Sequence, residues 1–319
     1  MKNIFVLSVL FSLCPFYALA DQKTGRFFED QKDINDDYQI HFIFLLAKDG
    51  VDREWDINGN IESLVLDINE KMLLATSRNK ANKKLGGPSK KYKFDYRNDG
   101  SVDISFLRMN KSRAQIASTS KGGPMADFDD FLFLKNFNNP KKIYLIFAEM
   151  GDKSGEGDAG VGLGAIYLKG FDEVSDRLKR LTAHELIHTQ GMGYECIKGV
   201  KNSHFTGDGN HMLQWGFNFN KKLYIHGQKD CPQMVDSVFL TPTSDDPYDP
   251  YEIACLWNIG KYTNKKFLKV IKSKIKRRDE NQSYKSKPRF GSDCRWRDYS
   301  RDSEGHYLVG SNINQLDKL

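Results

Sequence analysis

Two histidines with a glutamate between them form the most informative pattern in this sequence. The segment from His184 to His188 reads H-E-L-I-H, and side chains four residues apart project from the same face of a helix. Both imidazoles can therefore place a nitrogen about 2.0–2.1 Å from one zinc ion. Glu185 lies roughly 100° further round the helix, where it can hold a water without binding the metal. Zinc lowers the pKa of such a water to near 7, and the glutamate takes its proton during hydrolysis of a polarised carbonyl.

The same five letters also arise by chance on ordinary helices, so their surroundings matter. Apolar residues recur at helical intervals from Val174 to Leu181, and Asp172 or Ser175 can cap the first turn. Gly191 follows the second histidine by three residues and suits a left-handed helix end. We therefore predict an amphipathic helix up to about Gln190 that carries a zinc site.

From His184 to Gly191 the sequence reads H-E-x-x-H-x-x-G, which resembles the zinc helix of metzincin metallopeptidases. In that family the glycine allows a sharp turn that brings a third ligand to the metal. The predicted order of elements, with a strand, a helix, further strands, an edge strand and the zinc helix, also resembles the family. The resemblance implies a zinc-dependent peptidase with Glu185 as the general base.

The third ligand departs from the family pattern, because Tyr194 stands where a metzincin has its third histidine. Candidates further along the chain are Glu195, His204, Asp208 and His211. Some secreted bacterial metzincin-like proteins have a cysteine-containing insertion here, followed by a His, an Asp and a Met. The positions that match are Cys196, His204, Asp208 and Met212.

That likeness implies His204 as the third ligand, Asp208 as its alternative, and Met212 as the methionine turn beneath the metal. Each has a plain structural reading too: His204 as a surface histidine, Asp208 as part of a tight turn, and Met212 as a core residue.

The apolar pattern predicts the elements that must position this helix. A nearly continuous apolar run from Ile40 to Leu46 is typical of a strand buried on both faces. Helical spacing follows from Ile61 to Ala75, and 143–148 is a second strong strand. Between 102 and 106, apolar residues alternate with Asp103 and Ser105, which predicts a half-buried strand.

Six glycines between Gly151 and Gly164 indicate a flexible loop leading into an edge strand at about Ala159 to Leu168. Neither a Lys-Ser/Thr pair nor an immediate helix follows, so a phosphate-binding loop is disfavoured. The fold class predicted is α+β (mixed α/β): a zincin/metzincin-like mixed sheet with an active-site helix and a loop-rich, disulfide-bridged C-terminal half.

The first residues are typical of an export signal, with Lys2, an apolar run from Ile4 to Leu13, and Ala18-Leu19-Ala20. We expect cleavage after Ala20 and a secreted or periplasmic product. No later stretch has the length of a transmembrane helix. The expected organisation is a signal peptide at 1–20, a polar lead-in at 21–39, a catalytic domain at 40–260, and a basic C-terminal segment at 261–319.

Four cysteines remain after the signal, and none of them has C-x-x-C spacing. In an exported chain this favours two disulfides over a thiolate metal site. Three connectivities are open, and sequential pairing is preferred. The four are Cys196, Cys231, Cys255 and Cys294.

The chain carries 48 Lys+Arg against 42 Asp+Glu, a formal charge of +6, but the excess is local. Lys261 to Phe290 holds twelve basic residues and only two acidic ones, so the rest of the chain is net acidic. The charges of such a basic segment usually form a solvated face. The functional alternative is that the segment binds an anionic surface. No nucleic-acid-binding module is recognisable.

Two weaker signals concern calcium and specificity. Asp33, Asn35 and Asp37 lack EF-hand spacing, so support for Ca²⁺ is weak. The stretch from Asp245 to Tyr251 suits a Pro-rich surface turn, with a specificity wall, a calcium site or a phenol donor to the oxyanion as alternatives.

These patterns predict a secreted zinc-dependent metalloendopeptidase that acts on peptide or protein substrates and contains Zn²⁺. A non-catalytic secreted binding or adhesion protein on the same fold remains an alternative, as does a zinc-dependent cell-wall amidase.

Overall fold

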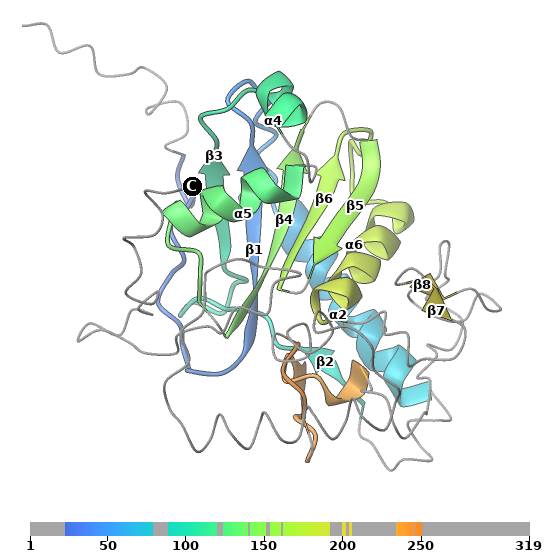
Figure 1. Cartoon of the computed structure of the whole chain (residues 1–319). Coiled ribbons are helices and arrows are strands. Elements are labelled where there is room, and N and C mark those ends of the chain that lie inside the picture. Colours follow the sequence, from blue (N-terminus) through green and yellow to red (C-terminus); the bar gives the residue numbers. More distant parts are fainter. Residues whose placement is uncertain are drawn as a thin grey trace, which may run out of the picture.

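A five-stranded sheet lies at the centre of the computed structural model (Figure 1). The structure describes residues 23–78, 89–119, 124–139, 141–150, 154–160, 162–191, 200–201, 204–205, 234–245 and 247–250. The predicted signal peptide, all four cysteines expected to form disulfides, Asp208, Met212 and the basic segment from Lys261 to Phe290 lie outside these residues.

The sheet has the strand order β3-β1-β4-β6-β5. Its first four strands are parallel, and β5 runs antiparallel to β6. This mixed α/β arrangement agrees with the predicted class. The bounds are β1 (Gln39–Leu46), β3 (Ile104–Arg108), β4 (Lys142–Glu149), β5 (Ser154–Gly160) and β6 (Leu163–Leu168).

Two helical layers cover the sheet and explain why its inner strands are buried on both faces and largely apolar. Alternate residues of β1 enter opposite cores, so all eight are buried, as the continuous apolar run predicts. One core includes the apolar stripe of α2 (Asn60–Arg78) and α6 (Asp176–Thr189). The other includes side chains from α4 (Arg113–Thr119) and α5 (Pro124–Leu134).

Smaller elements complete the described part of the chain. Strand β2 (Lys91–Tyr92) pairs with β9 (Leu240–Thr241), and β7 (Val200–Lys201) pairs with β8 (His204–Phe205). A short 3-10 helix, η1 (Met234–Asp236), precedes β9. Within the described ranges, none of the helices is long and apolar enough to span a membrane.

Two sequence expectations about strands are wrong. The polar residues of the predicted half-buried strand do not face water: Asp103 is 1% exposed and Ser105 is 0% exposed. The expected edge strand divides into β5 and β6, and β6 is internal. The glycine-rich residues 154–160, expected to be loop, form the edge strand instead.

Residues that precede β1 contact both the sheet and the loop that follows β1. Phe27 forms a parallel bridge with Ser105 of β3. The buried Arg26 side chain makes ion pairs with Asp52 (2.8 Å) and Asp56 (2.7 Å). The segment immediately before the first strand is therefore attached to the body by both backbone and charge contacts.

The acidic, aromatic stretch is exposed at Asp245 and Pro247, as a surface turn would be, but is buried from Tyr248 to Pro250. Tyr248 is 6% exposed and Asp249 is 5% exposed. The Tyr248 hydroxyl donates to the backbone oxygen of Gln190 at 3.4 Å, and Tyr38 donates to Asp249 at 3.1 Å. This stretch therefore packs against the end of α6.

Candidate metal centre

Helix α6 begins and ends where its sequence predicts. Ser175 is the N-cap, and its hydroxyl accepts a hydrogen bond from the amide of Leu178. At the other end the amide of Gly191 donates to the carbonyl of His188, and Gly191 has a φ of 74°. Glycine adopts this left-handed conformation at little cost. The cap and the glycine together fix the length of the helix that carries the histidines.

Two histidines on α6 point at a common centre. The Nε2 atoms of His184 and His188 are 3.1 Å apart, and their ring centroids are 4.7 Å apart. Nitrogens about 2.0–2.1 Å from a tetrahedral zinc lie roughly 3.3 Å from each other. The spacing on the helix thus produces the separation that two ligands of one zinc ion require.

His204 joins this pair from the β7–β8 hairpin. Its ring centroid lies 5.3 Å from that of His184 and 5.0 Å from that of His188. One nitrogen from each of the three rings lies within 4.8 Å of the others. Lys201 pairs with His204 across the hairpin, so the chain turns back there and returns His204 to the helix.

Of the candidates for the third position, His204 is the one within the described residues, and there it lies beside the helix histidines. Glu195, Asp208, His211 and Met212 lie outside the described residues.

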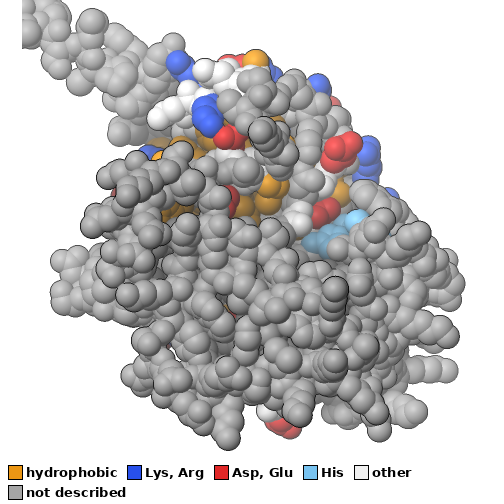
Figure 2. Space-filling view, viewed as in Figure 1, with side chains coloured by type: hydrophobic (Ala, Val, Ile, Leu, Met, Phe, Trp, Pro, Cys, Tyr) orange, Lys and Arg blue, Asp and Glu red, His pale blue; other side chains and the backbone are white. Residues whose placement is uncertain are grey.

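The donor set and its exposure fit a zinc ion with an open side. Three imidazoles form a ligand set typical of catalytic zinc, which keeps one position for water or substrate. His184 is 4% exposed, while His188 and His204 are partly exposed. Histidine side chains are visible on the face shown in Figure 2. The site therefore has a buried support and a side open to solvent.

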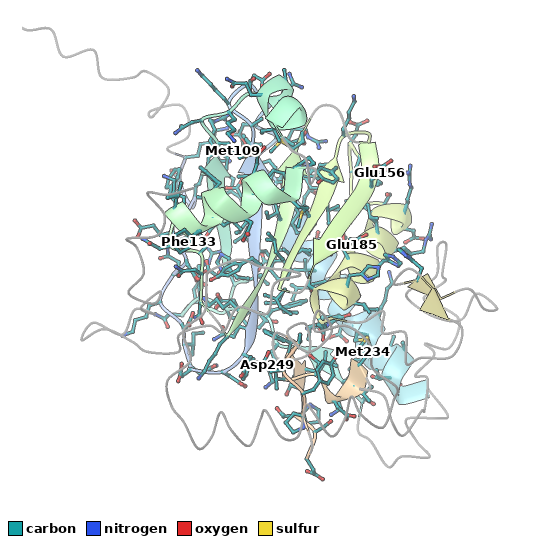
Figure 3. All side chains as sticks on the ribbon, in the orientation of Figure 1. Met109, Phe133, Glu156, Glu185, Met234 and Asp249 are labelled. Atoms are coloured by element: carbon teal, nitrogen blue, oxygen red, sulfur yellow. The ribbon has the colours of Figure 1, made fainter. Side chains whose placement is uncertain are left out.

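Glu185 lies between α6 and the edge strand β5. It is 3% exposed, and Figure 3 shows it on α6 beside the sheet. A Cβ atom added to Gly157 of β5 would lie 2.6 Å from both Cδ and Oε1 of Glu185. The glutamate is thus enclosed by the backbone of the edge strand. Sequence reasoning missed the role of Gly157, for which the glycine-rich composition of 151–164 was the available signal.

The end of α6 is further held by Tyr248. Burial raises the pKa of Tyr248 well above its ordinary value, so its hydroxyl keeps its proton and can donate to Gln190. The proposed calcium residues also have partners elsewhere: Asp33 pairs with Lys142 at 2.5 Å and Asp37 with Lys93 at 2.9 Å.

A second group of titratable side chains lies at the start of the parallel strands. His41 Nδ1 is 2.9 Å from Asp95 and its Nε2 is 3.0 Å from the hydroxyl of Ser105. That hydroxyl donates its proton to the backbone oxygen of Glu29 at 2.9 Å, so Nε2 must donate to it. Burial alone would lower the pKa of His41, but Asp30, Asp95 and nearby Asp103 raise it. The imidazole is therefore cationic here.

Lys142 provides the second cation of this group. Its Nζ lies 2.5 Å from Asp30, 2.5 Å from Asp33 and 2.6 Å from Asp95. Burial alone would lower its pKa, but the three carboxylates raise it. Burial raises the pKa of Asp33 and of Asp103. Because ammonium and imidazolium groups already face these carboxylates, this is a charge cluster rather than a vacant metal site.

Neither a protein-family model nor a curated protein matches this sequence. Among solved structures, wild-type OgpA from Akkermansia muciniphila is similar over 52% of this chain, with 16% identity and a TM-score of 0.35. The similar region spans 51% of OgpA. OgpA has also been solved in catalytically inactive form with an O-glycopeptide substrate.

Two further structures have names that bear on the predicted resemblance. Archaemetzincin from Methanopyrus kandleri is 15% identical, covering 59% of this chain and 87% of its own, with a TM-score of 0.28. Metalloproteinase-II from Bacteroides fragilis is 14% identical, covering 62% and 52%, with a TM-score of 0.27. All of these identities are below 25% and all of these TM-scores are below 0.5, so this chain's own His184, His188 and His204 carry the functional argument.

Proposed function

We propose that this protein is a zinc-dependent metalloendopeptidase. The observation that carries the proposal is the convergence of three imidazoles from α6 and the β7–β8 hairpin beside the buried Glu185. His184, His188 and His204 would hold the metal. Zinc in such a site supplies Lewis acidity, which makes water acidic near neutral pH and polarises a carbonyl.

Glu185 carries out the proton transfers in this proposal. One carboxylate oxygen takes a proton from the attacking water and then returns it to the amine nitrogen that leaves. Its 3% exposure limits competition from bulk solvent, and its place on α6 one residue after His184 keeps it beside the metal ligands.

Strand β5 is the element that we propose binds the substrate backbone. It is the last strand of the sheet, and an extended peptide can pair with a free edge through its own N–H and C=O groups. Such pairing recognises peptide without requiring one side-chain sequence. This supports an endopeptidase with broad rather than narrow specificity.

Metal analysis and one conservative substitution test the proposal. Purified residues 21–319 should contain one zinc per chain. Glu185→Gln should keep that zinc but lower the cleavage of casein by about 10²–10⁴-fold, the usual contribution of general acid–base catalysis. Absence of stoichiometric zinc would refute the metallopeptidase assignment, as would unchanged proteolysis by the Glu185→Gln variant.

The third ligand is tested separately from the reaction. His204→Ala should release zinc from the purified protein, whereas Asp208→Ala should retain it. Zinc retention by His204→Ala would assign the ligand elsewhere. Cleavage of peptidoglycan without cleavage of protein would replace the peptidase by an amidase, and stable zinc with neither activity would favour a binding protein.

Export is proposed from the residues that precede Asp21. Amino-terminal sequencing of the protein recovered outside the cytoplasm should begin at Asp21. A product that retains Met1 inside the cell would refute this part.

A further inference from the structure

The edge strand β5 contacts α6 at the residue that the reaction would use. The pairing of β5 with β6 shifts register between Ser154 and Gly157, and such bulges re-aim an edge strand. After the shift, Gly157 pairs with Ile166. At this position, the three nearest atoms to an added Cβ all belong to Glu185.

The need for glycine at 157 comes from that contact and not from the backbone. Glycines with a left-handed φ occur elsewhere in the described chain, for instance Gly162 and Gly191, but Gly157 does not have one. An alanine could therefore adopt its backbone conformation. Its methyl group would instead overlap Cγ, Cδ and Oε1 of Glu185.

Glu185 has little room to move away. It is 3% exposed, and the overlap includes Cγ, in the middle of its side chain, as well as the carboxylate atoms Cδ and Oε1. Any residue larger than glycine would turn the carboxylate or push β5 outward. The bare backbone at Gly157 thus sets the position of the carboxylate.

We propose that Gly157 is a positioning residue for Glu185. It acts through the Glu185 side chain, and its catalytic consequence rests on the proposed function. The strand that would pair with the substrate backbone also fixes the group that moves the proton. A peptide aligned on β5 would therefore be aligned with Glu185 as well.

A double-mutant cycle in thermal unfolding tests the contact without any activity. Gly157→Ala should lower the unfolding midpoint by about 2–10 °C through overpacking. Glu185→Ala removes all three overlapped atoms, so adding Gly157→Ala to it should produce no further loss. An equal loss in both backgrounds would refute the proposal, because the added methyl group would then act on something other than Glu185.

A matched substitution on the same strand controls for damage to the edge. Glu156 is exposed, so Glu156→Ala should change the midpoint by the same small amount with or without Glu185→Ala. If positions 156 and 185 are coupled as strongly as positions 157 and 185, the cycle reports disorder of the strand. That result would contradict a specific contact between Gly157 and Glu185.

The kinetic test separates positioning from loss of structure. Gly157→Ala should lower kcat by about 100-fold while its zinc content and KM stay unchanged. Parallel loss of zinc and kcat would indicate collapse of the site and contradict the proposal. If the wild type has no peptidase activity, the proposed function fails, but the unfolding cycle still shows whether Gly157 is packed against Glu185. Failure of the proposed function can therefore be distinguished from failure of the proposed contact.

Discussion

Replacing Lys142 with methionine should lower the free energy of unfolding by about 3 kcal/mol at pH 7. Removing one partner of a buried ion pair costs about 3–5 kcal/mol, because the other charge stays buried without compensation. The Lys142 side chain is 1% exposed and faces Asp30, Asp33 and Asp95 within 2.6 Å. The lower end applies because the Asp30 and Asp33 side chains keep 19% and 23% exposure.

The neighbouring lysine supplies a matched control. Lys141 pairs with Asp36 at 2.9 Å, but the two side chains are 25% and 61% exposed. Exposed pairs of this kind contribute about 0–1 kcal/mol. Urea unfolding of Lys141→Met and Lys142→Met, followed by fluorescence at pH 7, should therefore separate two adjacent substitutions by at least about 2 kcal/mol.

The penalty should also depend on pH in a defined direction. Burial already raises the pKa of Asp33 above its ordinary value although Lys142 opposes the shift, so removing the ammonium group should raise it further. Groups shifted upward favour the folded state at low pH and lose that contribution as pH rises through the folded pKa. Lys142→Met should therefore lose less stability at pH 4.5 than at pH 7. Equal losses for Lys141→Met and Lys142→Met, or a larger loss at pH 4.5, would refute the cluster as the source of stability.

Two further outcomes are expected. The pKa of His41 is raised in the folded state, so its contribution to the free energy of unfolding is complete below about pH 6.5 and is lost as pH rises through the folded pKa. His41→Gln should therefore flatten the decline of the urea midpoint between pH 6 and 9. An unchanged slope would contradict the cationic assignment. Ser175→Ala removes the cap of α6 and should cost about 1 kcal/mol in urea unfolding, whereas Ser175→Asn should cost little; equal losses would argue against a capping role.

Much of the sheet is predictable from local sequence. The runs that become β1 and β4 are largely apolar because both faces of these strands enter a core. Their polar exceptions include His41 and Lys142, which enter the charge cluster. The stripe from Ile61 to Ala75 lies buried on α2 because its period matches the helix. These patterns depend only on neighbouring residues, so they need no knowledge of the rest of the chain.

The burial of polar residues is not predictable from local sequence. Asp103 and Ser105 alternate with apolar residues, which usually indicates one face in water. Their side chains instead enter the charge cluster around His41, whose members come from segments distant in the sequence. Alternation of polar and apolar residues shows which positions are polar. It does not show whether a partner from another segment will compensate the burial of a polar side chain.

The candidate centre divides in the same way. A spacing of four residues is enough to predict that His184 and His188 share a helix face with Glu185 beside them. The approach of His204 to these histidines and of β5 to Glu185 becomes visible only in the folded chain. Those contacts depend on how a hairpin and a sheet edge return to the helix, and the path of the chain between distant segments is not encoded in local spacing.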